Sequence, residues 1–159
     1  MKFVLIDKVL SFKLGSELTA TKSVSLAEEY LGDHFPIFPV LPGVLLLEGM
    51  IESASWLVRL TEAQRGPVIH SMVLLSSARN VKYKSFAAPG TKIEYCVKAN
   101  AIEENLSSFS GTGICGDETI VEAKFSLRHF NLADDKPAMA ATDAVIIENM
   151  KKRWKLLYQ

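Results

Sequence analysis

One short segment of the chain brings together the residue types needed for acid–base chemistry. His34 begins the run His-Phe-Pro, Pro42-Gly43 follows, and Glu48 comes five residues later in an apolar stretch. Prolines at positions 36, 39 and 42 restrict the backbone of the loop that carries the histidine. A helix that begins at Pro42-Gly43 would present unpaired backbone N–H groups. The segment therefore predicts a base, a carboxyl group and an oxyanion-type donor at one site.

Those three groups suit the elimination of water beta to a carbonyl. A base removes the alpha proton, a dipole stabilises the enolate-like charge, and an acid protonates the departing hydroxyl. A carboxylate among leucines is costly unless it is paired or used. Each residue also has an ordinary interpretation, because a loop histidine can bond to backbone and a lone glutamate can face solvent or a partner subunit. Spacing alone leaves both interpretations open.

The remaining pattern predicts the elements that must position this segment. A stripe at helical spacing, formed by Leu47, Ile51, Ala54 and Val58, predicts a buried helix from Val44 to about Leu60. Alternating apolar residues predict strands at 4–14, 18–24, 68–83 (one strand or two), 92–102, 106–115 and 119–130. A sheet that long beside one apolar helix must curl around it. The expected fold class is α+β, an antiparallel sheet wrapped around one long central helix.

The chain is expected to form a single domain with a helical C-terminal part. Its 159 residues are about the size of one domain. A polar break from Asp134 to Pro137 precedes a final helix, Thr142 to Tyr158, with Thr142 as its N-cap. We expect a domain over residues 1–133, and residues 134–159 as a helical extension of the same domain.

Composition and charge exclude several classes of protein. Lys plus Arg equals Asp plus Glu, 18 each, so net charge gives no reason to expect nucleic acid or an anionic membrane as partner. The apolar N-terminal run is too short for a signal peptide, and prolines interrupt the longest apolar stretch. Cys96 and Cys115 lack metal-like or redox-like spacing, which favours free thiols in the cytoplasm. No motif predicts a metal or nucleotide cofactor.

The segment from His34 to Glu48 resembles the signature of bacterial 3-hydroxyacyl-[acyl-carrier-protein] dehydratases, which are hotdog-fold enzymes of type II fatty-acid synthesis. The shared features are His-Phe-Pro, then Pro-Val-x-Pro-Gly-Val-Leu, and an acid fourteen positions after the histidine. A looser likeness extends over about residues 3 to 130, including Val4–Val9, Val81–Lys84 and the Pro89-Gly90-Thr91 turn.

The resemblance implies a role for each residue of the segment. His34 is the catalytic histidine, Glu48 the catalytic acid, and the Gly43 N–H the donor to the thioester carbonyl. The histidine and the acid come from different subunits, at the interface of a homodimer or a multiple of dimers. We expect the neighbouring Phe35 and Pro42 to contact the substrate.

Glu52 is the second acid of the predicted helix. It lies one turn after Glu48, so both carboxyls project on one side, and mutual repulsion would raise at least one pKa. On this interpretation Glu52 belongs to the substrate-binding site. The alternative is that it faces water or pairs with a cation.

Basic and apolar residues outside the segment predict two kinds of partner. Arg79, Lys82 and Lys84 match a basic strand that lies near the pocket mouth in the family, so we expect them to dock an acidic carrier protein. Leu45, Leu46 and Met50 lie outside the main helical stripe. They suggest more apolar surface than one sheet covers, and hence an oligomer.

The chain also departs from the family pattern. Asp33 and Ile37 replace glycines, Glu52 replaces a glutamine, and Lys82 replaces an arginine. The favoured function is dehydration of (3R)-3-hydroxyacyl to trans-2-enoyl carrier protein. The alternatives are a hotdog acyl thioesterase, which has no need of the His-Phe-Pro loop, and a non-catalytic acyl-thioester-binding relative. His70 and His129 lack a partner pattern and are expected to be structural, and Trp56 is expected in the core.

Overall fold

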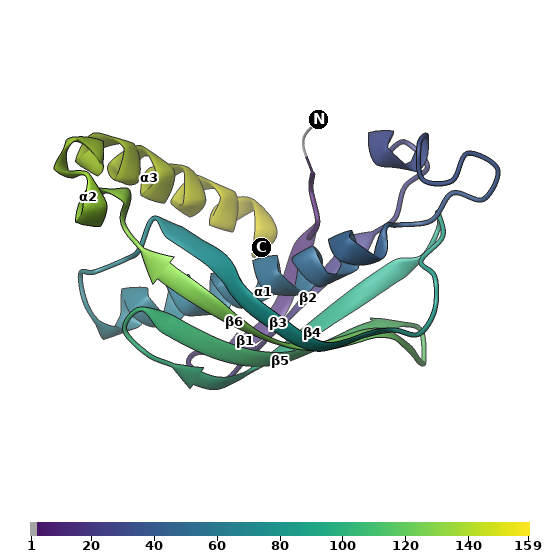
Figure 1. Ribbon diagram of the computed structural model, residues 1–159, viewed down its shortest axis with the longest axis horizontal. Coiled ribbons are helices and arrows are strands. Elements are labelled where there is room, and N and C mark those ends of the chain that lie inside the picture. The colour runs from purple at the N-terminus through teal and green to yellow at the C-terminus, as the bar shows by residue number, and fades with distance from the viewer. Residues whose placement is uncertain (1–2) are drawn as a thin grey trace.

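A six-stranded antiparallel sheet curves around one long helix in this computed structural model (Figure 1). The strands are β1 (Lys8–Lys13), β2 (Glu17–Ser23), β3 (Met72–Tyr83), β4 (Lys92–Ile102), β5 (Leu106–Cys115) and β6 (Glu118–Phe130). The helices are α1 (Gly43–Arg65), α2 (Leu132–Asp135) and α3 (Ala140–Leu157), with 3-10 turns at Glu29–Leu31 and Pro137–Met139. The structure describes residues 3–159. Met1 and Lys2, the start of the predicted 1–133 domain, lie outside the described residues.

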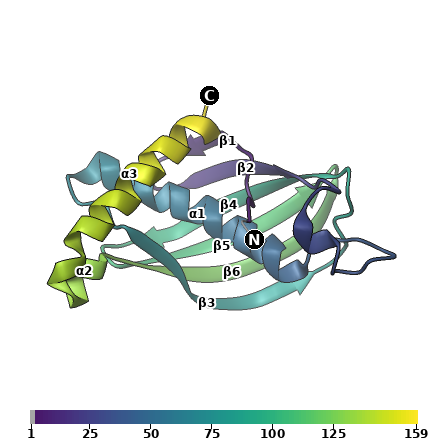
Figure 2. The ribbon, with the colours of Figure 1, turned by 90° about the horizontal axis from the view of Figure 1, so that it is seen from above.

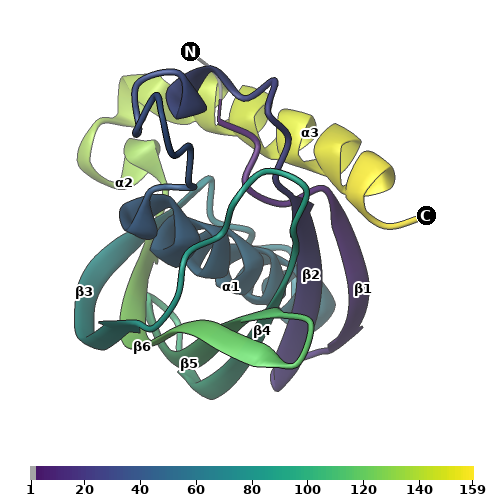
Figure 3. The same cartoon turned by 90° about the vertical axis from the view of Figure 1, so that its right-hand side faces the viewer.

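The order of strands across the sheet is β1-β2-β4-β5-β6-β3, so β1 and β3 form its two edges. Viewed along α1, the sheet encloses the helix from below and from both sides (Figure 3). The predicted fold class is therefore confirmed, and the strands at 92–102 and 106–115 have the predicted bounds. The predicted segment 68–83 forms one strand, which begins at Met72.

The central helix is longer than predicted. It continues past Leu60 to Arg65, because Thr61 and Glu62 in its last turns are buried rather than solvated. The Gly66 N–H closes the helix by donating to the Glu62 carbonyl at 3.1 Å. Because the buried residues at this end of the helix are polar, hydrophobic periodicity alone did not predict where the helix ends.

The expectation that the sheet would leave Leu46 and Met50 uncovered is wrong. Their side chains are 1% and 0% exposed in a single chain. Gly111 of β5 makes this possible, since a Cβ there would come within 3.0 Å of Met50 Sδ. The backbone of β5 thus approaches α1 closely enough for the sheet to cover Leu46 and Met50 as well as the main apolar stripe.

The C-terminal helix α3 crosses over α1 on the side that the sheet leaves open (Figure 2). Its Trp154 ring contacts the rings of Trp56 and Phe12, with centroids 5.5 and 5.6 Å apart. The helix begins at Ala140, so Thr142 is not its N-cap, and Met139 at that position makes no side-chain cap bond. Among residues 3–159, no helix is long and apolar enough to cross a membrane.

The predicted polar break contains part of the short helix α2, which the sequence analysis missed. Asn131 caps it in a capping box with Asp134. Asp143 of α3 accepts bonds from the backbone N–H groups of Leu132 and Ala133 at 3.0 and 2.9 Å. These contacts fix the chain between β6 and α3.

Replacing Gly49 tests how closely the sheet encloses α1. A Cβ at Gly49 would lie 2.4 Å from Cζ of Tyr95, a fully buried ring on β4. We expect Gly49→Ala to lower the free energy of unfolding by about 1–3 kcal/mol, because overpacking outweighs the better helix propensity of alanine. Chemical denaturation followed by circular dichroism measures this change.

Gly66→Ala is the matched control for that substitution. Gly66 has open space around it and an extended backbone, with φ of 171°. Its replacement should change the free energy of unfolding by less than about 0.5 kcal/mol. A Gly49→Ala protein as stable as the Gly66→Ala protein would contradict the close contact with Tyr95.

Candidate active site

The loop after the first 3-10 turn holds His34 in one tautomer. His34 Nδ1 lies 2.9 Å from the carbonyl oxygen of Val40, and the Val40 N–H donates to the His34 carbonyl at 3.2 Å. A carbonyl oxygen can only accept, so Nδ1 carries the hydrogen, and in the neutral ring Nε2 keeps its lone pair. The ring is half-buried against Phe35, with centroids 4.3 Å apart. The loop therefore presents Nε2 as a base.

The replacements at Asp33 and Ile37 do not strain this loop. Among residues 3–159, the only non-glycine residue with a positive φ is Asn80, at 54° in β3. Neither position thus requires the left-handed backbone that favours glycine. Ile37 lies at the tip of the loop and is fully exposed. The His34–Val40 closure forms without either glycine.

The start of α1 meets the histidine loop. Gly43 is the first residue of α1, and its N–H has no hydrogen-bond partner within residues 3–159. A Cβ at this position would lie 3.0 Å from Cε1 of Tyr83, so glycine allows the ring to lie against the helix start. His34 and Gly43 line one cavity of about 140 Å³. The structure therefore brings together the predicted base and the predicted oxyanion donor.

Glu48 lies elsewhere along α1. It lines a second cavity of about 320 Å³ together with Glu52 and Arg153, and His34 does not line this cavity. The side chain is exposed at its surface, yet partial burial of the carboxyl raises the Glu48 pKa above its ordinary value. Within a single chain, the predicted acid and the predicted base thus face different spaces.

Glu52 is engaged by a residue that the sequence analysis did not connect with it. Its Oε1 lies 2.5 Å from Nη2 of Arg153 on α3. Burial raises the Glu52 pKa, Arg153 opposes that rise, and Glu48 adds to it. Of the two interpretations given to Glu52, pairing with a cation is the one observed.

The surface around the histidine loop is apolar and uncovered. Phe35 is exposed and Pro42 is half-buried, and neither lines the His34 cavity or the Glu48 cavity. Tyr83, which contacts Gly43, ends the edge strand β3, and toward the start of that strand Leu74 and Leu75 are 47% and 42% exposed. An unpaired edge strand with apolar side chains is a ready surface for another chain.

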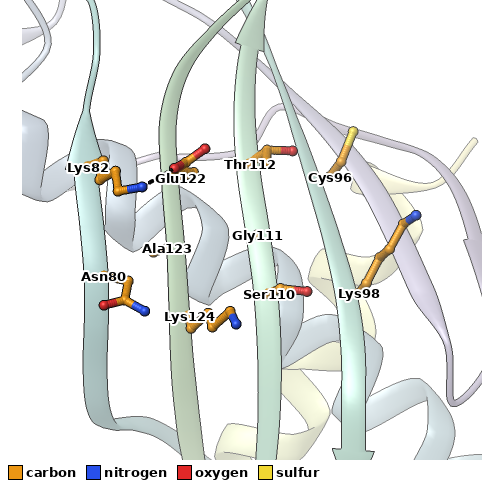
Figure 4. A pocket seen from close by; sticks show the side chains of 10 residues that line it. All are labelled: Asn80, Lys82, Cys96, Lys98, Ser110, Gly111, Thr112, Glu122, Ala123 and Lys124. Carbon is orange, nitrogen blue, oxygen red and sulfur yellow. Dashed lines mark ion pairs between the residues drawn. The ribbon is translucent and has the colours of Figure 1, made fainter.

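The predicted basic cluster surrounds an acid. Lys82 and Lys84 both bind Glu122 of β6, at 3.1 and 2.6 Å, while Arg79 is exposed. Lys82 and Glu122 line a groove of about 700 Å³ on the outer face of the sheet, opposite α1 (Figure 4). Lys84 instead lines the His34 cavity. The cluster thus connects the cavity with the outer face of the sheet.

His70 and His129 meet at a buried acid, although the sequence offered no partner pattern. Glu62 Oε1 accepts a bond from His70 Nδ1 at 2.8 Å and lies 3.0 Å from His129 Nδ1. Burial raises the Glu62 pKa, but bonds from His129 and His70 more than offset it and hold the pKa below its ordinary value.

The types and spacing of these three residues would suit a metal ion, since one ligand atom from each lies within 4.8 Å of the others. However, His129 Nε2 is also bonded to Ser107 Oγ, at 2.8 Å. Because the three side chains already interact with one another, we assign the cluster to the internal polar network of the core.

Arg59 is a residue of the α1 surface that the sequence analysis overlooked. It lines the Glu48 cavity, and its Nη2 donates to the Ser71 carbonyl at 2.8 Å. The available signal was a single cation in the apolar stretch Trp56 to Leu60. The same reasoning that selected Glu48, a charge in an apolar helix, would have selected Arg59.

Comparison with known proteins identifies the family of the chain. A family model described as a FabA-like domain matches residues 1–124. A 3-hydroxyacyl-[acyl-carrier-protein] dehydratase FabZ from Janthinobacterium sp. (strain Marseille) is 30% identical over 135 residues, 85% of this chain and 86% of the relative. The FabZ of Gluconobacter oxydans (strain 621H) is 32% identical over 126 residues, 78% of this chain and 72% of the relative.

Among solved structures, the dehydratase heterocomplex ApeI:P from Xenorhabdus doucetiae contains a chain that superposes with a TM-score of 0.71. The sequences are 16% identical, and the match covers 86% of this chain and 90% of that one, which supports the fold alone. The family model and the FabZ relatives decide the family. This chain belongs to the FabA-like family.

Proposed function

We propose that this chain dehydrates (3R)-3-hydroxyacyl groups carried on acyl carrier protein to trans-2-enoyl groups, the reaction class for which its FabZ relatives are named. One observation carries the proposal. His34, whose Nδ1 is bonded to the Val40 carbonyl so that Nε2 is free to act as a base, lines the same cavity as Gly43, whose N–H is unpartnered. A base beside an oxyanion donor suits proton removal next to a thioester carbonyl.

The reaction uses three groups. The Gly43 N–H donates to the thioester oxygen, and His34 Nε2 takes the proton from C2. The electron pair of that C–H bond forms the C2=C3 double bond while the C3–O bond breaks. Glu48 gives its proton to the departing hydroxyl, which leaves as water. The raised pKa of Glu48 supports this role, because the carboxyl keeps its proton to higher pH.

The proposed site requires two chains. His34 and Glu48 face different cavities in one chain, so we propose that a second copy supplies the acid to each histidine. The uncovered β3 edge and the exposed Phe35 support a homodimer, or a multiple of dimers, in which the two sheets join edge to edge. Phe35 and Pro42 would then contact substrate at this interface.

We also propose that residues 134–159 belong to the same domain as the preceding residues. Trp154 and Arg153 of α3 contact Trp56 and Glu52 of α1, which supports this assignment. Cys96 and Cys115 are free thiols in the structure. The cytoplasmic location stays a prediction.

Mixed dimers test the shared site. His34→Ala and Glu48→Gln should each lower kcat at least about 100-fold, because each removes a proton-transfer group. Mixing the two variants after unfolding and refolding should restore roughly a quarter of wild-type activity, since half the dimers are mixed and each has one intact site. Turnover of a 3-hydroxyacyl thioester followed at the enoyl absorbance measures both effects.

Two results would count against this arrangement. Mixtures as inactive as the separate variants would contradict a site shared between chains. A monomer in light scattering for the wild-type protein would contradict it independently. Circular dichroism of each variant serves as the control for folding.

Charge reversal on the basic strand tests carrier-protein docking. We propose that Arg79, Lys82 and Lys84 attract the acidic carrier protein near the His34 cavity. Lys82→Glu with Lys84→Glu should lower kcat/KM at least about 10-fold with carrier-protein substrate at low salt, since complementary charge mainly speeds association. Activity with a short pantetheine thioester should change far less.

The control reverses two charges that do not line that cavity. Lys151→Glu with Lys152→Glu makes the same charge change on α3, where both lysines line a hollow with Trp56 and Ala63 in the C-terminal half of α1. This variant should keep its activity with carrier-protein substrate. If the strand variant loses activity with both substrates equally, the strand residues serve the fold or the pocket and the docking proposal is wrong.

A further inference from the structure

The Glu48 cavity is also lined by a second charged residue of α1, Arg59. Glu48 and Arg59 both line it, eleven residues apart on one helix, which corresponds to about 16 Å at 1.5 Å per residue. Apolar side chains form much of the wall between them, including Ile51 and Trp56 of α1, Leu5, and Met150 of α3. The spacing of its lining residues along α1 and its largely apolar lining suit an extended chain.

Only one of the two terminal nitrogens of the Arg59 guanidinium donates a hydrogen bond within the described residues. Nη2 donates to the Ser71 carbonyl, whereas Nη1 is buried and has no hydrogen-bond partner within residues 3–159. No carboxylate of the described chain forms an ion pair with it. Burial lowers the Arg59 pKa to about 10, with opposition from Glu62, so the group stays charged at neutral pH. A buried donor without an acceptor is costly.

The other three charged residues that line this cavity either form an ion pair or have a role in the proposed reaction. Glu52 and Arg153 neutralise each other in an ion pair. Glu48, with its raised pKa, is the proton donor of the proposed reaction. Arg59 is consequently the one charge in the lining of this cavity that is neither paired nor used.

We propose that this cavity holds the acyl chain, and that Arg59 selects chains whose distal end carries a carboxylate. The inference rests on the dehydratase function proposed above, since it places the reacting carbons near Glu48. An extended chain along α1 then directs its far end to Arg59, where a carboxylate oxygen makes a charge-assisted hydrogen bond with the guanidinium. A methyl-ended chain leaves the guanidinium without this acceptor, and a site built around a polar contact discriminates strongly against the analogue that lacks it.

Three synthetic substrates test the proposal with the full-length dimer. Two are 3-hydroxyacyl pantetheine thioesters of equal length, one ending in a carboxylate and the other in a methyl group. The third, a 3-hydroxybutyryl pantetheine thioester, is too short to reach Arg59 and reports dehydration itself. We expect wild-type kcat/KM to favour the carboxylate over the methyl ending by roughly 10- to 100-fold, the value of one hydrogen bond between charged groups.

Two matched variants locate that preference. Arg59→Met should abolish or reverse the carboxylate-to-methyl ratio, because it replaces the cation with an apolar side chain of similar length. Arg65→Met makes the same change on the last turn of α1, where the exposed Arg65 donates to the Ile102 carbonyl. This control should keep the wild-type ratio.

The outcomes separate the two proposals. A wild-type protein that dehydrates the short substrate without preferring the carboxylate would overturn the role of Arg59, as would a preference that survives in Arg59→Met. Failure to dehydrate any of the three substrates would instead refute the dehydratase function. If Arg59→Met does not fold, the wild-type ratio decides alone.

Discussion

Burial of α1 inside the curved sheet determines where every group of the proposed site lies. Eleven of its 23 residues are buried, so the helix cannot rotate or slide without breaking the core. That constraint fixes Gly43 against Tyr83 at one end. It also holds Glu48 and Arg59, eleven residues apart on the helix, in the wall of one cavity. The chemistry thus depends on a scaffold whose position is set by packing rather than by the polar groups themselves.

The division of the site between two cavities would give the proposed dimer a role in the chemistry. His34 and Gly43 share one space, while Glu48 faces another, so we infer that a single chain is incomplete as a catalyst. The same chain leaves the β3 edge and the loop around Phe35 uncovered. Association would complete the acid–base pair and cover these apolar surfaces in one step.

Local patterns predicted the fold well, and long-range contacts limited the prediction of the site. The bounds of β4 and β5 were predicted to the residue: the buried residues of β4 alternate with exposed ones, and turns at Glu104-Asn105 and Gly116-Asp117 delimit β5. The segment His34 to Glu48 was recognisable because its prolines, glycine and acid are close in sequence. Pairing of Glu52 with Arg153 joins residues on different helices, and His70 meets His129 only after β3 pairs with β6. Hydrophobic periodicity describes neighbours along one helix or strand, so it cannot predict contacts between residues this far apart in the sequence.

The most direct test of the account is mass spectrometry of the chain incubated with 3-hydroxyacyl carrier protein. The account predicts that the carrier-bound acyl group loses one water and remains attached to the carrier. A parallel incubation with His34→Ala should leave the substrate unchanged, which ties the loss to the loop held by Val40. Release of free carrier protein would instead identify a thioesterase. An unaltered acyl carrier with the wild-type protein would contradict the dehydratase function.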